Sequence, residues 1–506
     1  MLSIRGLTVA SRYCRFAVST RVHAVATLDL DLDFQQRNSK VGVVDSPTPY
    51  TVCRQHRRLM STLYTAFGDG EKVPFLSRPD VDVEYIMQNI DRMKANVTAR
   101  NMKFDFENLS QVWKRVQELK VKVESLESEK QRMNRLAKEI NIKKGSEEEK
   151  QKIRRQSKEL RQELKEVNTI FSRASEDLFT IVLKLPNFTH ADTPMGSEVI
   201  VVYSHGEKEA FQPWMRSHVE IGKQKDLLSL GHDNVHRGAC YFKNEVTLLE
   251  QAVLSWISES LHKHGLLQMS CPDMFRDLIV EGCAQNMEEV YSVIGSDGIL
   301  YLKGSSIMSF AAYYTMMVLE NDNLPDKCFS IGRNYNPKYE TDNLTSLCVM
   351  QQSTMVHVCG LTRNSDIESD QVFQEFIEIL RSLFSQLTIH FRMVNLPSCK
   401  LSPAMSRKSS LQIWLPSEKQ YVEVASVEHY TDFISRRLKI QHPTSMREQA
   451  VKSRNRSYCQ IVFGTAINVP AFIAAILEQY QQQDGSILIP PPLVEFMYNH
   501  PVIAES

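Results

Sequence analysis

The chain has 506 residues with 60 basic and 60 acidic side chains, so only local charge clusters can indicate a nucleic-acid partner. Its 42% hydrophobic content suits a globular protein of roughly two to four domains. No apolar run approaches the roughly 20 residues of a membrane-spanning helix. The ten cysteines form no C-x-x-C pair, which argues against a zinc ribbon or disulfide framework and favours a reducing compartment.

The first 28 residues contain four arginines, many Ser and Thr, and no acidic residue. This composition is typical of a mitochondrial presequence, and the segment has no long apolar stretch of the kind found in secretory signals. We therefore predict location in the mitochondrial matrix and assign residues 1–60 to a presequence and a variable segment. A disordered basic tail is the alternative interpretation.

Two apolar heptad patterns follow, at residues 109–140 and 153–181. Between them, Gly145 is a plausible helix stop, and Ser146 with Glu149 has the spacing of a capping box. Two heptad patterns joined by a short turn predict an antiparallel coiled coil.

The outer half of this predicted hairpin is basic, with 13 Lys or Arg against 7 Glu between residues 129 and 165. An ordinary solvated coiled-coil surface would also be rich in charge. The excess of positive charge on an exposed arm makes contact with RNA phosphates physically reasonable. The candidate RNA-binding residues are Lys143, Lys144, Arg154, Arg155, Lys158 and Arg161.

Four landmarks of the C-terminal part resemble the seryl-tRNA synthetase family. They are L-K-L-P-N-F-T-H at 183–190, H-V-E-I-G at 218–222, a helix at 244–264 followed by M-S-C-P at 269–272, and D-G-S-I-L-I-P-P at 484–491. The resemblance implies an α+β fold, with the antiparallel-sheet core of a class II aminoacyl-tRNA synthetase and an N-terminal antiparallel coiled-coil arm. We accordingly expect an N-terminal domain at 61–185, its hairpin at about 108–183, and a class II domain at 186–506.

Several positions that carry charged or polar groups in the family hold other residues here. The resemblance places Ile307 where an acid binds the serine ammonium and Tyr335 where a Glu lies near the adenine. It places His357 where a Glu reads the serine hydroxyl and Ala471 where an Arg holds the far phosphates of ATP. Phe463 replaces a further polar residue.

Other positions keep the residue type of the family. They are Arg333, which the resemblance assigns to the α-phosphate, Glu423, assigned to ATP and magnesium, and Ser426 and Thr465.

From these replacements we expect a catalytically degenerate, non-catalytic protein, closest to the non-catalytic mitochondrial seryl-tRNA synthetase-like proteins of insects. Such a protein would have no serine–tRNA ligase activity, no productive ATP binding, no cofactor and no metal. It would bind tRNA, with tRNA-Ser as the first candidate, or other RNA through its arm. A protein-interaction module and a divergent active ligase remain as alternatives.

The segment at 244–272 resembles the dimer-forming element of class II synthetases. We therefore expect a dimer, either a homodimer or a heterodimer with the active mitochondrial seryl-tRNA synthetase.

Overall fold

The structure, a computed structural model, describes residues 79–504 apart from internal gaps. The gaps are residues 143–145, 209, 231–237, 296–297, 305, 338–345 and 445–455. The chain divides into two compact units, Met1–Arg58 and Leu59–Ser506. The predicted presequence and the candidate RNA contacts Lys143 and Lys144 lie outside the described residues.

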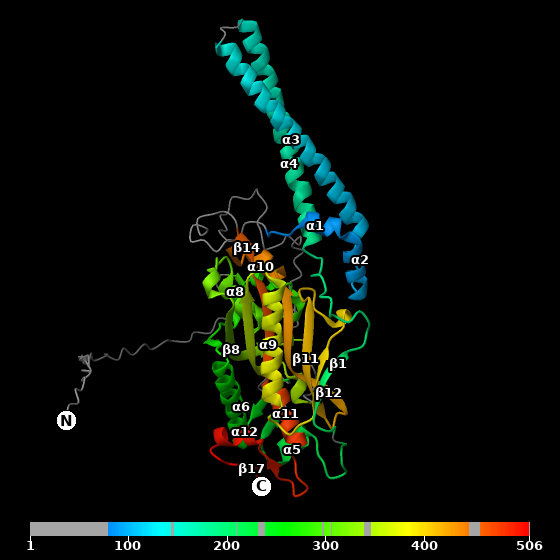
Figure 1. Cartoon of the computed structure of the whole chain (residues 1–506), viewed down its shortest axis with the longest axis vertical. Helices are drawn as coiled ribbons and strands as arrows, with labels where there is room; N and C mark the ends of the chain where they lie inside the picture. Colours follow the sequence, from blue (N-terminus) through cyan, green and yellow to red (C-terminus); the bar gives the residue numbers. More distant parts are fainter. Residues whose placement is uncertain are drawn as a thin grey trace, which may run out of the picture. The chain divides into compact units, whose positions relative to one another are not determined.

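Two long helices, α3 (Phe106–Ile142) and α4 (Glu147–Val182), lie side by side and form the arm (Figure 1). They contain 37 and 36 residues, which gives each a length of about 55 Å at 1.5 Å per residue. The predicted antiparallel hairpin is therefore confirmed. Two short helices, α1 (Val83–Gln88) and α2 (Ile90–Ala99), precede it.

The predicted heptad positions face inward between the two long helices. At the base of the arm, Leu109, Leu178 and Val182 are buried in a cluster that also includes residues of α1 and α2. Further out, a small cluster centred on Leu126 and Leu164 holds the helices together. The apolar contact thins along the arm, so packing at its base contributes most to its stability.

An eight-stranded sheet forms the core of the remaining chain, in the order β1-β10-β11-β12-β15-β9-β8-β4. All neighbouring strands are antiparallel except β4 and β8. The strands are β1 (Ile200–His205), β4 (Leu267–Met269), β8 (Asp326–Tyr335), β9 (Gln352–Thr362), β10 (Phe391–Asn395), β11 (Arg407–Leu415), β12 (Gln420–Thr431) and β15 (Gln460–Asn468). The sheet and the helical arm confirm the predicted α+β architecture.

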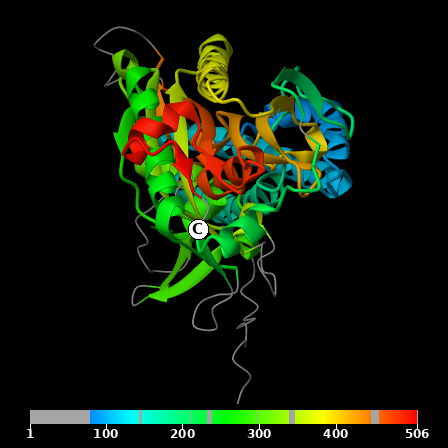
Figure 2. The same cartoon turned by 90° about the horizontal axis from the view of Figure 1, so that it is seen from below.

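Helices cover both faces of this sheet. One apolar core contains side chains of α6 (Asn244–Lys263), α9 (Asp366–Phe384) and α11 (Val469–Gln479). Figures 1 and 2 show α9, in yellow, along one face of the sheet. The second core contains α7 (Asp277–Gly282), α8 (Ile307–Tyr314) and α10 (Phe433–Leu438). Successive strand residues alternate between the two cores, as a pleated strand requires.

Buried polar contacts attach the helical segment to the sheet. The Arg100 guanidinium donates to the carbonyl oxygens of Asn187, Ser402 and Met405 at 3.0, 2.9 and 2.6 Å. The Asn187 amide donates to the carbonyl of Tyr430 at 2.8 Å. Burial lowers the pKa of Arg100 to about 10, so it remains a cation at neutral pH. Residues 59–506 form one unit, and the division at residues 185 and 186 stays a prediction.

The remaining elements are short. The helices are α5 (His218–Gln224) and α12 (Pro491–Val494), with 3₁₀ turns at Met287–Glu289, Asn321–Asn323, Leu347–Val349, Ser398–Lys400 and Glu495–Met497. The strands are β2 (Leu228–Leu230), β3 (Cys240–Phe242), β5 (Met274–Phe275), β6 (Tyr291–Gly295), β7 (Gly298–Leu302), β13 (Gln441–Pro443), β14 (Arg456–Tyr458), β16 (Ile487–Leu488) and β17 (Val502–Ile503). Within the described ranges, no helix combines the length and apolarity needed to cross a membrane.

Candidate functional site

One face of the sheet carries a row of polar side chains that crosses five strands in register. Ser410 of β11 lies opposite Ser426 of β12, and Ser426 lies opposite Thr465 of β15. Thr465 lies opposite His357 of β9, which lies opposite Ser330 of β8. Opposed residues of antiparallel strands point to the same face. The row therefore places hydroxyl and imidazole groups side by side on the sheet.

A charged cluster lies next to this row. Lys408 of β11 is directly opposite Glu428 of β12. Its Nζ atom lies 2.8 Å from Glu423 Oε1 and 3.0 Å from Glu428 Oε1. The side chains of Lys408 and Glu428 are 15% and 7% exposed. Burial acts to lower the pKa of Lys408, but the two carboxylates outweigh it and raise the pKa, so the side chain stays charged.

Hydroxyl groups donate further hydrogen bonds to the two carboxylates. The Ser410 hydroxyl donates to Glu423 Oε2 at 2.7 Å, and the Tyr430 hydroxyl donates to Glu428 Oε2 at 2.7 Å. Ser426 Oγ lies 3.4 Å from Glu428 Oε1. Burial first, and Glu428 second, raise the pKa of Tyr430, so its hydroxyl keeps its proton and acts as the donor. The cluster thus joins β11 and β12 through charged hydrogen bonds.

His357 is held by a neighbouring hydroxyl and an aromatic ring. Its Nδ1 atom lies 3.1 Å from Thr465 Oγ1. Its ring stacks on Phe463, with centroids 5.1 Å apart and an interplanar angle of 26°. The replacement Phe463 therefore packs against the replacement His357, and the structure brings both together with Thr465 on the polar face.

Two of the replaced positions lie in apolar cores. Ile307 begins α8 and is 5% exposed within the core that α7, α8 and α10 form. Ala471 lies in the first turn of α11 and is 1% exposed within the opposite core. Neither side chain belongs to the polar row.

Arg333 and Tyr335 are separated from the polar row by strand register. Arg333 lies opposite Thr354, which is three residues from His357 on β9, so their side chains point to opposite faces. Arg333 is exposed. The Tyr335 hydroxyl lies 3.5 Å from Asp273 Oδ2, and burial raises the pKa of Tyr335. Of the four kept positions, the structure brings Glu423, Ser426 and Thr465 together and leaves Arg333 apart.

The described RNA-binding candidates lie along α4. Arg154, Arg155, Lys158 and Arg161 are all exposed. Arg155 pairs with Glu159 at 3.2 Å, an exposed contact that costs little to break. Arg161 lines an open hollow on the arm together with Lys130 and Lys165.

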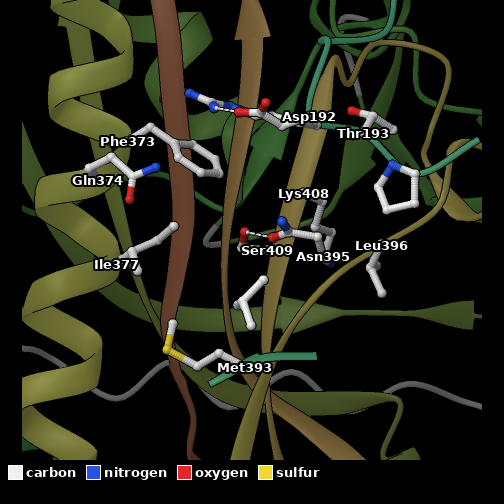
Figure 3. Close-up of a pocket in the computed structure, with 13 residues that line it drawn as sticks. Asp192, Thr193, Phe373, Gln374, Ile377, Met393, Asn395, Leu396, Lys408 and Ser409 are labelled. Carbon is white, nitrogen blue, oxygen red and sulfur yellow. Dashed lines mark hydrogen bonds and ion pairs between the residues drawn. The ribbon is translucent and has the colours of Figure 1, made fainter. Parts of the chain in front are cut away.

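A cavity of about 150 Å³ lies between α9, β10 and β11 (Figure 3). Arg407 stacks over the Phe373 ring at 3.8 Å and pairs with Asp192 at 3.5 Å beside it. Ser409 donates to Asn395 Oδ1 at 2.6 Å. Because Arg407 and Ser409 alternate with Lys408 and Ser410 along β11, the cavity and the polar row lie on opposite faces of the sheet.

Sequence reasoning missed Lys408, Ser410 and Glu428. On β12, Ser426 and Glu428 stand on either side of Val427, which marks one polar face of that strand. The start of β11 is polar at every position from 407 to 410 and gives no such signal. Only the register between β11 and β12 shows that Lys408 and Glu428 meet.

The fold is that of the class II aminoacyl-tRNA synthetases. The structure aligns with the seryl-tRNA synthetase of Pyrococcus horikoshii complexed with ATP, with a TM-score of 0.76 and 20% identity over 84% of this chain and all of that chain. It also aligns with the cytoplasmic Serine-tRNA ligase of Naegleria fowleri in complex with AMP, with a TM-score of 0.70 and 18% identity over 83% of this chain and 96% of that chain.

Sequence comparison finds similarity to seryl-tRNA synthetases. Residues 81–189 match the Seryl-tRNA synthetase N-terminal domain. The chain is 27% identical to the "Serine--tRNA ligase, mitochondrial" of Mus musculus over 92% of this chain and 91% of that protein. It is 27% identical to the protein of the same name in Bos taurus over 78% of this chain and 77% of that protein. Along most of its length the chain is therefore similar to mitochondrial seryl-tRNA synthetases.

These comparisons correct the prediction that the chain is not an enzyme. The relatives are named serine–tRNA ligases, and the two aligned structures are complexes with ATP and AMP. The narrower resemblance to non-catalytic insect proteins finds no support among them. The prediction counted losses at motif positions such as Ile307 and Ala471. The replacement of motif residues does not by itself show that activity is lost.

Proposed function

We propose that the protein acts in the serylation of mitochondrial tRNA, as a tRNA-binding subunit of a dimeric serine–tRNA ligase. The observation that carries the proposal is the long helical hairpin with its exposed cations. Arg154, Arg155, Lys158 and Arg161 are exposed along one helix of an arm about 55 Å long.

The charge of the arm supports contact with a polyanion. The chain has no net charge, yet residues 129–165 carry six more cations than anions. Lysine and arginine side chains bind RNA by releasing counterions from its phosphates, and this contribution needs no base-specific contact. A rigid hairpin that holds these cations away from the sheet suits the recognition of a folded RNA by its shape.

Exposed apolar side chains support a dimer. Val293, Ile294 and Ile299 of the β6–β7 hairpin are 37%, 89% and 52% exposed, and Leu267 of the edge strand β4 is 66% exposed. Apolar side chains that gather in one exposed patch mark protein–protein interaction sites. The strand β4 directly follows α6, the helix that resembles the dimer-forming element, whereas the β6–β7 hairpin comes later in the chain.

A second copy of this chain and an active mitochondrial seryl-tRNA synthetase are the two candidate partners. Self-pairing across a two-fold axis is the common arrangement for soluble oligomers. Native mass measurement of the assembly purified from mitochondria distinguishes them. The mitochondrial location is supported by the two mitochondrial relatives and by the acid-free, arginine-bearing first 28 residues.

The proposal is tested by filter binding of tRNA to the full chain between about 50 and 200 mM salt. The test variant is R154Q/R155Q on the outer arm, and the matched control is K114Q/R115Q, two exposed cations on α3. We expect the slope of log affinity against log salt to fall by about 1.4–1.8 in the test variant if two phosphate contacts are lost. The control should leave the slope unchanged. Equal slopes in wild type and R154Q/R155Q, with tRNA still bound, would show that the outer arm is not the tRNA site.

A further inference from the structure

Four carboxylate oxygens converge beside the polar row, and each has a partner from the chain itself. Glu423 Oε1 and Glu428 Oε1 bind Lys408 Nζ. Glu423 Oε2 accepts from Ser410, and Glu428 Oε2 accepts from Tyr430. Two glutamates that face one point are the usual protein contribution to a divalent-cation site.

A magnesium ion, which the family resemblance assigns to Glu423, does not fit these residues as they stand. Magnesium requires near-octahedral oxygen ligands at about 2.0–2.1 Å. The two oxygens that face the centre of the cluster instead hold an ammonium group at 2.8 and 3.0 Å. The described residues include no group of three or more His, Cys, Asp or Glu side chains placed to hold a metal ion.

We infer that Lys408 is the resident cation of this site and occupies the place that a divalent metal ion would take between Glu423 and Glu428. The inference goes beyond the proposed function, because it concerns the cation at the sheet and is independent of tRNA binding. A tethered ammonium cannot exchange with solvent ions. Its positive charge also repels a second cation, strongly so where little water separates them.

The burial of Lys408 and its two partners supports its place as a fixed cation of the site. Its side chain is 15% exposed, and Glu428, on the inner side, is 7% exposed. Glu423 is 38% exposed and forms the outer edge of the cluster. Removing the ammonium would leave two carboxylates facing each other, with hydroxyls of Ser410 and Tyr430 beside them. That arrangement offers hard oxygen ligands and an uncompensated negative charge, which favours divalent cations.

The test is a titration of the full chain with Mn²⁺, followed by electron paramagnetic resonance. Wild type and E428Q should bind the same number of Mn²⁺ ions, because wild type holds none at this site. K408M should bind one further ion per chain, and K408M/E428Q should lose it again. Circular dichroism shows whether each variant is folded.

Two results would overturn the inference. One is a Mn²⁺ ion in wild type that E428Q loses. The other is a folded K408M chain that binds no more Mn²⁺ than wild type. If K408M does not fold, K408Q, which keeps a polar side chain of similar length, replaces it in the same comparison. If neither folds, the comparison of wild type with E428Q decides alone, since equal binding supports the inference and loss rejects it.

Discussion

His218 and Glu478 form a buried hydrogen-bonded pair that connects four segments of the class II core. His218 Nδ1 lies 2.6 Å from Glu478 Oε1, and the side chains are 1% and 0% exposed. The Leu347 N–H donates to His218 Nε2 at 3.1 Å, so the imidazole carries its proton on Nδ1 and donates it to Glu478. Glu478 also accepts from the Ser417 hydroxyl at 2.5 Å. His218 of the H-V-E-I-G segment therefore has a structural role in the core.

Removal of the Glu478 carboxylate should strongly lower the stability of the protein. We predict that E478A lowers the free energy of unfolding by about 3–5 kcal/mol, because buried partners are left without it. The control E495A removes an exposed glutamate and should change stability by less than about 0.5 kcal/mol. Urea denaturation measures both. If E478A lowers the free energy of unfolding by less than about 1 kcal/mol, the buried pair does not stabilise the core in this way.

The same carboxylate predicts a pH dependence of stability. Burial acts to raise the pKa of Glu478, but hydrogen bonds from His218 and Ser417 outweigh it and lower the pKa below its ordinary value of 4.5. The unfolded state therefore binds the proton more readily than the folded state. The stabilisation is present above pH 4.5 and is lost as the pH falls through the folded pKa. In urea titrations below pH 4.5, wild type should lose more stability than E478Q.

Gly304 is required by a close approach of two backbone segments. Its φ is +67°, and a Cβ atom there would lie 1.7 Å from the Arg333 carbonyl oxygen. We predict that G304A destabilises the protein by at least about 2 kcal/mol, through overpacking and backbone strain. G196A is the matched control, since a Cβ atom at Gly196 meets nothing within 4 Å. Equal melting temperatures for the two variants would contradict this account.

For single residues, the sequence located the candidate site positions but did not show what packs around them. The family landmarks located Ile307, His357 and Ala471, but they could not show that Ile307 and Ala471 pack in apolar cores. Nor could they show that Arg333 points away from His357, because that depends on the register of β8 with β9. Register between strands far apart in sequence is set by the whole sheet and leaves no local signal.

At the scale of elements, the arm was predictable because its signal is local. Heptad spacing alone located α3 and α4. Helix 244–264 was likewise confirmed, since α6 spans Asn244–Lys263 and Gly265 follows with a φ of +78°. The polar row was not predictable in the same way, since its five residues come from five strands.

The outer arm is the element most sensitive to loss of packing. Leu164 is 7% exposed in the small outer cluster, whereas Val121 is 65% exposed. We predict that L164A costs about 2–5 kcal/mol locally and opens the outer arm before the base. Hydrogen exchange should quicken along residues 119–167 and stay unchanged near Leu109. V121A should leave exchange unchanged at both places. Equal acceleration at the base and in the outer arm would show that the arm unfolds as one unit.

At the scale of the whole molecule, the proposed function gives the arm and the class II core different roles. In the proposed function, the exposed apolar segments of the core would meet a partner subunit, and the exposed cations of the arm would bind tRNA. If the two act together in serylation, a change confined to the outer arm must alter the use of tRNA without altering the sheet.

The most direct test of the proposed function is the serylation of mitochondrial tRNA by the native assembly that contains this chain. Assemblies purified with wild type, R154Q/R155Q or K114Q/R115Q are compared at subsaturating tRNA with labelled serine. The account predicts that kcat/KM for tRNA falls at least about tenfold in R154Q/R155Q, equivalent to about 1.4 kcal/mol, and stays near wild type in K114Q/R115Q. Serylation that is unchanged by R154Q/R155Q in an assembly containing the variant would contradict it.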